Sequence, residues 1–321
     1  MYIYLVVGLV LVIKGADFLV NGASTIARRF SVSEFVIGLT VVSFGTSLPE
    51  LIITLISGSE GKTDLIIGNI VGSNIANVLL VLGIAAMIRR LPTPNSTVTR
   101  EIPFTVIASI VLVFLLNNGF MDTDQPLALS RWDSGILFVF FVVFIGYTAA
   151  IVRNQKSDEK EWVGEVAHHS PLRSGVEIVA GMLALYFGGD MAVMKGAVPI
   201  AESWGMSEAF IGLTVIAIGT SLPELATSAV AAYKKNVDIA VGNVVGSNIF
   251  NILFVLGVNS AVRPIAFDTK FNIDLGIMVA TTMALLVFMY VGHPKRTIQR
   301  REGALFFACY LAYMVFVIRR G

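Results

Sequence analysis

The chain reads Gly45-Thr46-Ser47-Leu48-Pro49-Glu50-Leu51 within a long apolar run, and it repeats these seven residues unchanged as Gly219-Thr220-Ser221-Leu222-Pro223-Glu224-Leu225. A second motif follows each copy at the same distance. Gly68-Asn69 through Gly72-Ser73-Asn74-Ile75-Ala76-Asn77 matches Gly242-Asn243 through Gly246-Ser247-Asn248-Ile249-Phe250-Asn251, always with an offset of 174 residues. Ionisable residues are costly inside a membrane, so a duplicated acid in an apolar run indicates a functional site.

The composition is that of an integral membrane protein. The chain is 55% hydrophobic and 14% charged, and its mean hydropathy is +0.80. A net charge of +1 with scattered basic residues argues against a nucleic-acid partner. The single cysteine, Cys309, excludes an intramolecular disulfide and a thiol metal cluster. The first apolar run is interrupted by Lys14 and Asp17 and lacks a basic start, so we expect a retained span rather than a signal peptide.

Apolar runs predict an all-α protein with ten transmembrane helices. Their expected limits are 2–27, 31–58, 64–88, 101–118, 134–152, 172–203, 207–233, 238–262, 268–291 and 299–318. A polar linker, 153–171, separates a first five-helix repeat (1–152) from a second (172–321). Because five is odd, the second repeat enters the membrane from the opposite side, which predicts two inverted repeats.

Basic residues predict the orientation of the spans. Connections after the odd-numbered spans hold fifteen Lys and Arg residues, and the other side holds six. By the positive-inside rule, both termini then lie outside the cytoplasm of a multi-pass cell-membrane protein, which would be the inner membrane in a bacterium. A reversed or dual orientation is the alternative, since several of these connections carry only two charges.

The second and seventh spans should each be broken near the middle of the membrane. Pro49 cannot donate to the carbonyl of Gly45, so two half-helices are expected, with partly negative carbonyls at the end of the first. A simple packing kink is the alternative, but it does not require the same glutamate twice. Helical spacing places one set of residues along the same side of the second span: Ser43, Thr46, Ser47, Glu50 and Thr54. The equivalent positions of the seventh span are Ala217, Thr220, Ser221, Glu224 and Ser228.

The third and eighth spans each present polar side chains every four residues on one face. These are Asn69, Ser73 and Asn77, and in the second copy Asn243, Ser247 and Asn251. The glycines between them allow neighbouring helices to approach closely. Hydrogen bonding between helices without any ligand is the alternative role, and it applies most to Asn69 and Asn243, which lie further from the middle of the membrane.

Two facing carboxylates with hydroxyl, amide and carbonyl oxygens would make a site for a hard cation. Calcium takes 6–8 oxygen ligands in flexible geometry, and the same oxygens could instead hold two sodium ions. Magnesium is less suited because it loses water reluctantly. No Cys or His lies near the motifs, which disfavours softer metals. The candidate ligands are Ser43, Thr46, Ser47, Glu50, Ser73, Asn77, Ala217, Thr220, Ser221, Glu224, Ser247 and Asn251.

Two further charged pairs lie in the first and sixth spans. Lys14 and Asp17 are three residues apart and could pair on one helix face. Asp190 and Lys195 are five apart, which is a poor spacing for an α-helix. We expect structural roles for these residues, or a place at the edge of an ion pathway.

The motifs resemble the two alpha-repeats of the sodium/calcium exchanger family, within the cation/calcium antiporter superfamily. The resemblance implies that Glu50 and Glu224 are central ligands of calcium and sodium, and that Thr46 and Thr220 add backbone oxygens to the calcium site. It also implies sodium-site positions for Ser47, Ser73, Ser221, Ser247 and the carbonyl of Ala217, with Asn77 and Asn251 beside the central site. The linker is too short for the calcium-sensing domains of animal exchangers, so the resemblance is to the prokaryotic type.

One residue departs from the potassium-dependent branch of the superfamily, which typically has an aspartate where this chain has Asn251. The amide removes a full negative charge and weakens the case for transported potassium. The resemblance therefore implies a calcium/sodium antiporter that works by alternating access, with these ions as substrates and no cofactor.

Other functions remain as alternatives. Two nearby carboxylates repel each other, so one could bind a proton, which keeps a cation/proton antiporter on the same scaffold open. An intramembrane protease fits poorly, because Phe187-Gly188-Gly189-Asp190 is not a G-x-G-D pattern and no histidine is placed for a serine mechanism. A channel would not need duplicated ligand sets. We thus expect a transporter rather than an enzyme, and no feature indicates an obligate protein partner.

Overall fold

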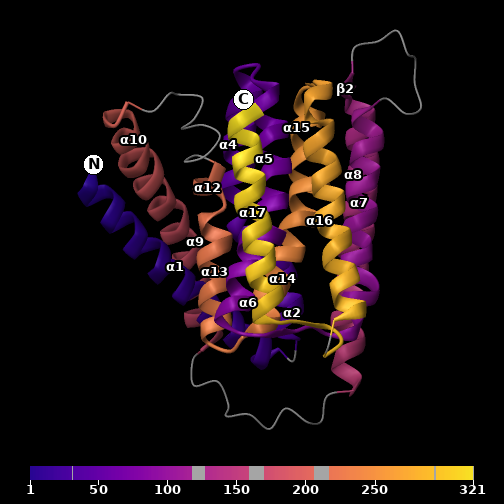
Figure 1. The fold of residues 1–321 in the computed structure, drawn as a ribbon. Helices are drawn as coiled ribbons and strands as arrows, with labels where there is room; N and C mark the ends of the chain where they lie inside the picture. Colours follow the sequence, from indigo (N-terminus) through magenta and orange to yellow (C-terminus); the bar gives the residue numbers. More distant parts are fainter. Residues whose placement is uncertain (31, 118–126, 159–169, 206–216, 293, 321) are drawn as a thin grey trace.

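The computed structural model describes the chain except for residues 31, 118–126, 159–169, 206–216, 293 and 321 (Figure 1). Nine helical spans among the described residues are long and apolar enough to cross a membrane: Tyr2–Arg29, Glu34–Ser59, Thr63–Ile88, Thr97–Leu116, Arg131–Arg153, Pro171–Ser203, Val237–Val262, Thr269–Val291 and Arg300–Arg320. Each begins within four residues of its predicted start. The predicted seventh span is described from Ala217 to Tyr233, and its first part lies outside the described residues.

Several spans combine α-helix with a turn of π-helix. The first five spans are α1 (Tyr2–Arg29); α2 (Glu34–Ile37), η1 (Gly38–Val42), α3 (Ser43–Thr46) and α4 (Leu48–Ser59); α5 (Thr63–Ala76), η2 (Asn77–Val81) and α6 (Leu82–Ile88); η3 (Thr97–Glu101) and α7 (Ile102–Leu116); and α8 (Arg131–Asp158). The fourth span begins with a π-helical turn, Thr97–Glu101, most of which lies before the predicted start of the span at residue 101.

The remaining spans are α9 (Pro171–Ala192), η4 (Val193–Ala197) and α10 (Val198–Ser203); α12 (Ala217–Thr220) and α13 (Leu222–Tyr233); α14 (Val237–Ile249), η6 (Phe250–Val255) and α15 (Leu256–Val262); η7 (Thr269–Phe271) and α16 (Asn272–Val291); and α17 (Arg300–Arg320). In these spans, η4 and η6 are again π-helical turns, whereas η7 is a 3-10 turn. The prediction of an all-α membrane protein is confirmed.

Helices α1 and α9 pack against each other in opposite directions at one side of the bundle (Figure 1). Glycines permit the contact: a Cβ atom on Gly15 would lie 2.8 Å from the backbone nitrogen of Leu185, and one on Gly188 would lie 2.8 Å from that of Val12. These are the first spans of the two halves, so their antiparallel packing agrees with an inversion of the second half.

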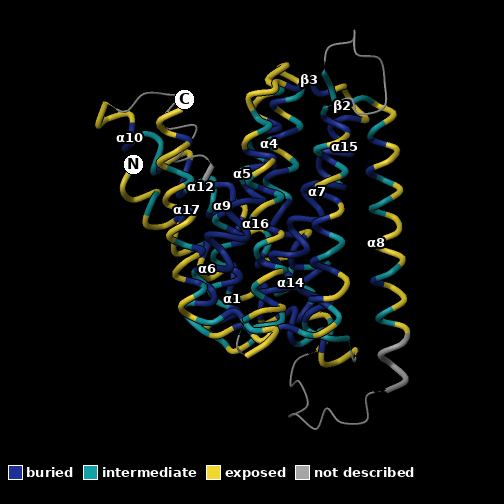
Figure 2. Tube along the Cα trace, turned by 45° about the vertical axis from the view of Figure 1, so that its right-hand side comes forward, coloured by how far each residue is buried: buried dark blue, intermediate teal, exposed yellow. Residues whose placement is uncertain are grey.

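The third and eighth spans form the centre of the bundle, and most of their residues are buried (Figure 2). The outer spans α1, α8, α16 and α17 expose one apolar face each, as expected for helices in contact with lipid. The central spans carry the second motif, so the motif lies where the protein excludes lipid.

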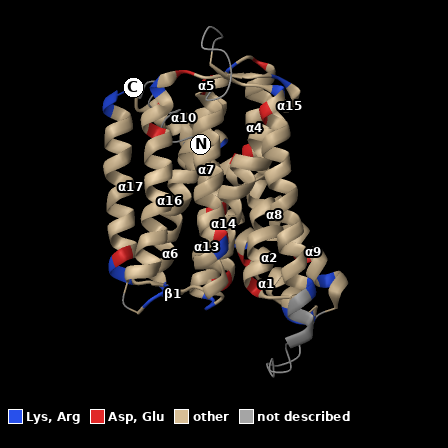
Figure 3. Cartoon of the chain, turned by 90° about the vertical axis from the view of Figure 1, so that its right-hand side faces the viewer, with Lys and Arg blue, Asp and Glu red and all other residues tan. Residues whose placement is uncertain are grey.

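Two short antiparallel strand pairs close opposite ends of the bundle. Strand β1 (Leu91–Pro92) pairs with β4 (Thr297–Ile298), and β2 (Ala128–Leu129) pairs with β3 (Ile265–Ala266). Leu91 and Ile265 are related by the 174-residue offset. The corresponding connections nevertheless lie at opposite ends, β3 at the top of Figure 2 and β1 at the bottom of Figure 3, which again agrees with inversion.

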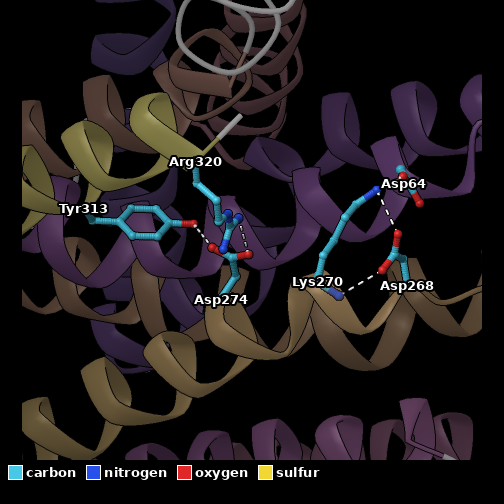
Figure 4. A network of polar contacts seen from close by, with 6 residues as sticks. All are labelled: Asp64, Asp268, Lys270, Asp274, Tyr313 and Arg320. Carbon is cyan, nitrogen blue, oxygen red and sulfur yellow. Dashed lines mark hydrogen bonds and ion pairs between the residues drawn. The ribbon is translucent and has the colours of Figure 1, made fainter.

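A polar network holds the last helix at the end of the bundle near the C-terminus (Figure 4). The buried carboxylate of Asp274 accepts hydrogen bonds from Arg320 Nη2 at 2.6 Å and from Tyr313 Oη at 3.1 Å. Lys270 pairs with Asp64 and, at 3.1 Å, with Asp268. The backbone N–H and the ammonium group of Lys270 hold the pKa of Asp268 below its ordinary value. The first group connects α16 with α17, and the second connects η7 with α5.

Candidate functional site

The two Gly-Thr-Ser-Leu-Pro-Glu motifs lie at interruptions of the second and seventh spans. α3 ends at Thr46 and α4 begins at Leu48, and α12 and α13 flank Ser221 in the same way. Ser47 is nonetheless bonded on both sides, because its N–H donates to the carbonyl of Ser43 at 3.0 Å and its carbonyl accepts from Leu51 at 3.2 Å. The predicted division into half-helices therefore takes the form of a one-residue interruption.

Glu50 and Glu224 are both fully buried, at 0% and 1% exposure. Oε1 of Glu224 accepts hydrogen bonds from Ser47 Oγ at 3.3 Å and from Ser247 Oγ at 3.4 Å. Within the part of the chain that the structure describes, Glu224 Oε2 and both carboxylate oxygens of Glu50 have no hydrogen-bond partner. A buried carboxylate without donors is unfavourable, so these oxygens are suited to a cation or a proton.

Each threonine of the first motif meets an asparagine from the other half of the chain. Thr46 Oγ1 donates to Oδ1 of Asn243 at 3.1 Å, and Asn69 Nδ2 donates to Thr220 Oγ1 at 3.4 Å. The 174-residue offset relates Thr46 to Thr220 and Asn69 to Asn243. The two contacts are therefore equivalent, and they hold the second motif of each half against the first motif of the other.

The serines of the two halves do not follow this equivalence. Ser221 Oγ donates to Ser73 Oγ at 3.5 Å, whereas the corresponding Ser47 and Ser247 both donate to Glu224. Glu50 has no such donors among the described residues. The two glutamates thus have identical sequence neighbours but different surroundings.

The asparagines at the end of the second motif differ in the same way. Asn77 Nδ2 donates to Oδ1 of Asn248 at 3.0 Å, and Asn248 Nδ2 donates to the carbonyl of Asn74 at 3.4 Å. Asn251, the counterpart of Asn77, is 0% exposed, and both polar atoms of its side chain lack a partner among the described residues. Oδ1 of Asn77 also lacks a partner among the described residues, so both asparagines offer an amide oxygen to an ion, and they differ in whether the NH2 group is held.

Ser43 and Ala217, which are also counterparts, differ in what they can offer. The buried Ser43 hydroxyl donates to the carbonyl of Leu39 at 2.7 Å, within its own span. Its oxygen also packs on α14, where a Cβ atom on Gly246 would lie 2.5 Å from Ser43 Oγ and 2.4 Å from the Leu39 carbonyl oxygen. Ala217 begins α12 and can offer only its backbone carbonyl.

The expected pairing of the charges in the first and sixth spans is wrong in two respects. Asp17 pairs with Lys234 rather than with Lys14. Asp190 and Lys195 do pair, at 2.8 Å, despite their spacing of five residues. The π-helical turn η4 brings residues i and i+5 together, which an α-helix would not do. Both pairs lie in partly exposed positions, unlike the buried glutamates.

The model of the family described as sodium/calcium exchanger protein matches residues 1–150 and 174–319 of this chain. The chain belongs to the sodium/calcium exchanger family. This is a family of membrane transporters, with calcium and sodium as its transported substrates, so the protein is a multi-pass membrane transporter. The resemblance seen in the motifs is confirmed.

Relatives in the sodium/calcium exchanger family match along most of their length. The chain is 36% identical to inner membrane protein YrbG of Escherichia coli (strain K12), covering 91% of this chain and 90% of that protein. It is 32% identical to sodium/calcium exchanger MaX1 of Methanosarcina acetivorans, covering 98% and 97%. It is 28% identical to Ca(2+)/H(+) antiporter ChaA of Bacillus subtilis (strain 168), covering 85% and 80%.

The fold is also that of a solved family structure. The sodium-calcium exchanger NCX_Mj soaked with 2.5 mM Na+ and 1 mM Sr2+ matches with a TM-score of 0.82 at 30% identity, covering 97% of this chain and 96% of that chain. The relatives thus include proteins named as a sodium/calcium exchanger and as a Ca(2+)/H(+) antiporter.

The candidate ligands predicted from the sequence do not include Asn69 and Asn243. Both contact threonines of the first motif, and Asn243 Nδ2 also donates to Ser228 Oγ at 3.0 Å. Asn259 was missed altogether: its Nδ2 donates to Thr54 Oγ1 at 2.9 Å, one turn beyond Glu50. Asn69 and Asn243 are related by the 174-residue offset, and this repetition could have identified them as candidate ligands. Asn259 has no polar counterpart, since Ala85 stands in its place.

Proposed function

We propose that this protein is a secondary antiporter that exchanges calcium for sodium by alternating access. The observation that carries the proposal is the pair of buried glutamates, one from each half, whose carboxylate oxygens are largely without hydrogen-bond donors. A divalent cation offsets the charge of two carboxylates, and oxygen-only ligands suit calcium. The relative MaX1, a sodium/calcium exchanger, supports the same substrates.

The spacing of the side-chain oxygens supports a shared ion site. Oxygen ligands at 2.3–2.6 Å from a calcium ion and at right angles to each other lie roughly 3.3–3.7 Å apart. The contacts of Glu224 with Ser47 and Ser247, and of Ser73 with Ser221, measure 3.3 to 3.5 Å. These distances are long for hydroxyl hydrogen bonds, which are usually about 2.5–3.0 Å. The oxygens are thus spaced more like neighbouring ligands of an ion than like firmly bonded partners.

The ligand set that we propose combines both halves. Glu50 and Glu224 would bind calcium or sodium at the centre, with Thr46 and Thr220 beside them and Ser47, Ser73, Ser221, Ser247 and the carbonyl of Ala217 in sodium positions. Asn77, Asn251 and Ser43 would lie around this centre. Calcium and sodium would compete for the same carboxylates, and that competition couples their movements.

We propose the two five-span repeats, 1–152 and 172–321 with the linker 153–171, as the units that face each other across this site. The antiparallel packing of α1 and α9 and the opposite positions of β1 and β3 support an inverted arrangement. The excess of basic residues after odd-numbered spans supports a cell-membrane orientation with both termini outside the cytoplasm.

A cation/proton antiporter is the second candidate, favoured by the relative named Ca(2+)/H(+) antiporter. The decisive experiment loads proteoliposomes with sodium, dilutes them into sodium-free buffer and measures radiocalcium uptake. A pH gradient is imposed in a separate set without sodium. We expect uptake with the sodium gradient. Uptake driven only by the pH gradient supports the second candidate. If neither gradient drives uptake, the antiporter is rejected.

A further inference from the structure

A basic depression lies at the end of the bundle that carries β1, away from the buried glutamates. Its volume is about 590 Å³, and three connections far apart in the sequence form it. Figure 3 shows Lys and Arg gathered at this end. The lining residues are Arg89, Arg90, Pro92, Lys235, Val237 and Arg300.

The four basic side chains of this depression lack acidic partners. In the described ranges of the chain, Arg89, Arg90, Lys235 and Arg300 form no ion pair. Arg300 Nη2 donates only to the carbonyl of Ile88, at 3.1 Å, at the end of α6. Like charges around one depression repel each other, so the group that complements them is an anion.

Lys235 occupies a backbone conformation that disfavours a side chain. Its φ is +71°, in the left-handed region. It follows the last turn of α13, where the N–H of Lys235 donates to Ala232 at 3.2 Å and that of Asn236 donates to Ala231 at 2.8 Å. Glycine or asparagine is usual at such a helix end. The chain thus keeps a basic side chain at the edge of the depression, at a position where glycine would be less strained.

The backbone adds to the positive potential of the same depression. Val237 is the first residue of α14 and Arg300 is the first residue of α17, so two helix N-termini border it. Helix N-termini carry partial positive charge and free N–H groups, which favour phosphate. The first turn of each helix also holds one acid, Asp238 in α14 and Glu302 in α17, so the four basic side chains remain the main source of positive charge. Basic pockets between transmembrane helices at a membrane face are suited to lipid phosphate groups.

We propose that the basic depression binds a phosphate group, which comes either from the headgroup of an anionic lipid or from a free phosphate compound. The residues that would hold it lie at the ends of the spans that carry Glu224, Asn77 and Asn243, and at the start of the last span. A bound phosphate would connect α6, α13, α14 and α17 and stabilise their arrangement. This binding does not depend on which ions the protein transports.

The test measures the thermal unfolding midpoint, Tm, of the full-length protein in a neutral detergent. One arm adds phosphatidylglycerol to the micelles, a second adds phosphatidylcholine, and a third adds inorganic phosphate. We expect phosphatidylglycerol to raise the Tm in a saturable way and phosphatidylcholine to leave it unchanged. A saturable rise with inorganic phosphate alone would assign the site to a free phosphate compound.

Lys235→Gly is the sharpest variant, because it removes the charge and relieves the left-handed strain. The matched control is Arg296→Gly, which does the same at φ +60° but lies outside the lining of the depression. Each basic side chain near an anionic lipid favours binding by about fivefold. We expect Lys235→Gly to keep or raise the basal Tm and to weaken phosphatidylglycerol binding about fivefold, while Arg296→Gly binds like the wild type.

A second comparison removes two charges at once. The double variant Arg89→Gln with Arg300→Gln should weaken binding about 25-fold. Its control, Lys295→Gln with Arg301→Gln, loses the same charge at the same end of the bundle but outside the depression, and should bind normally. Equal effects of the two double variants, or no Tm shift with either phosphate probe, would overturn the proposal.

Discussion

Ser47 and Glu224 come from different halves of the chain, and the Ser47 hydroxyl donates to Oε1 of Glu224 at 3.3 Å. Ser47 is also the residue at which the second span is interrupted, three positions before Glu50. The interruption thus directs a hydroxyl toward the carboxylate of the other half. A cation at Glu224 would be shared by both halves, so movement of one half against the other would change its ligands.

Replacing either glutamate should abolish calcium exchange. Glu50→Gln and Glu224→Gln each remove a charge that offsets the lost hydration of a divalent ion. We expect sodium-driven radiocalcium uptake to fall to the level of empty liposomes. Glu60→Gln is the control, because Glu60 lies at the exposed end of α4 and pairs only with Lys62 at 2.6 Å. Near wild-type exchange by either purified site variant would reject the shared central site.

The asymmetry between the two glutamates predicts unequal effects of equivalent serines. Ser47→Ala removes a donor to Glu224, whereas Ser221→Ala removes only a contact with Ser73 at 3.5 Å. The 3.3 Å contact is long for a hydrogen bond, but it places the Ser47 oxygen beside the Glu224 carboxylate, so Ser47→Ala should raise the ion concentration for half-maximal uptake by roughly severalfold. Ser221→Ala should change it several times less. Indistinguishable titrations in calcium and in sodium would contradict this prediction.

Gly246→Ala should destabilise the contact between α14 and the second span. Its Cβ atom would lie 2.4 Å from the carbonyl oxygen of Leu39, so the helices must separate. Overpacking of this kind costs about 1–3 kcal/mol, which should lower the Tm. Gly146→Ala is the control: Gly146 is exposed on α8 and no atom of the described chain lies within 4 Å of an added Cβ. That variant should be neutral or slightly stabilising.

The ion pair that holds the last helix should contribute more to stability than exposed pairs do. Asp274→Asn leaves Arg320 without its partner and weakens the contact with Tyr313. The Asp274 side chain is 5% exposed and that of Arg320 is 32% exposed, so we expect a loss of roughly 1–3 kcal/mol, less than for a fully buried pair. Lys62→Gln breaks an exposed pair and should change the Tm little. Equal Tm values for the two variants would contradict the prediction.

Much of this fold could be predicted from the sequence because lipid imposes a simple rule on it. Spans must be long and apolar, so their starts were placed within four residues of those observed. Glu50 and Glu224 could be predicted as candidate ligands because an acid inside such a span has no ordinary structural explanation. The repeat then assigned Ser73, Ser247, Asn77 and Asn251 to one buried region, where the structure places them.

What the sequence could not supply is the departure from symmetry. Identical motifs predict identical contacts, yet Glu224 has two serine donors and Glu50 has none among the described residues. Such differences depend on how the halves are shifted relative to each other, which no local pattern records. The pairing of Asp190 with Lys195 was missed for a related reason, since a π-helical turn changes which residues face each other.

Asn251→Asp should change the ion dependence of transport. Asn251 is 0% exposed and its side-chain amide has no partner in the described part of the chain, so an aspartate there would add a charge that only a cation or a proton can balance. The equivalent Asn77→Asp is the control, because Asn77 donates to Asn248 at 3.0 Å and its replacement also breaks that bond. We expect Asn251→Asp to insert stably, to respond to potassium and to shift its sodium and pH dependence. Asn77→Asp should mainly lower the Tm.

The measurement is calcium exchange against sodium concentration and pH, with and without potassium. Strict potassium dependence of the wild type would place this chain in the potassium-dependent branch, against our prediction. Identical curves for wild type and Asn251→Asp would place Asn251 outside the ion pathway.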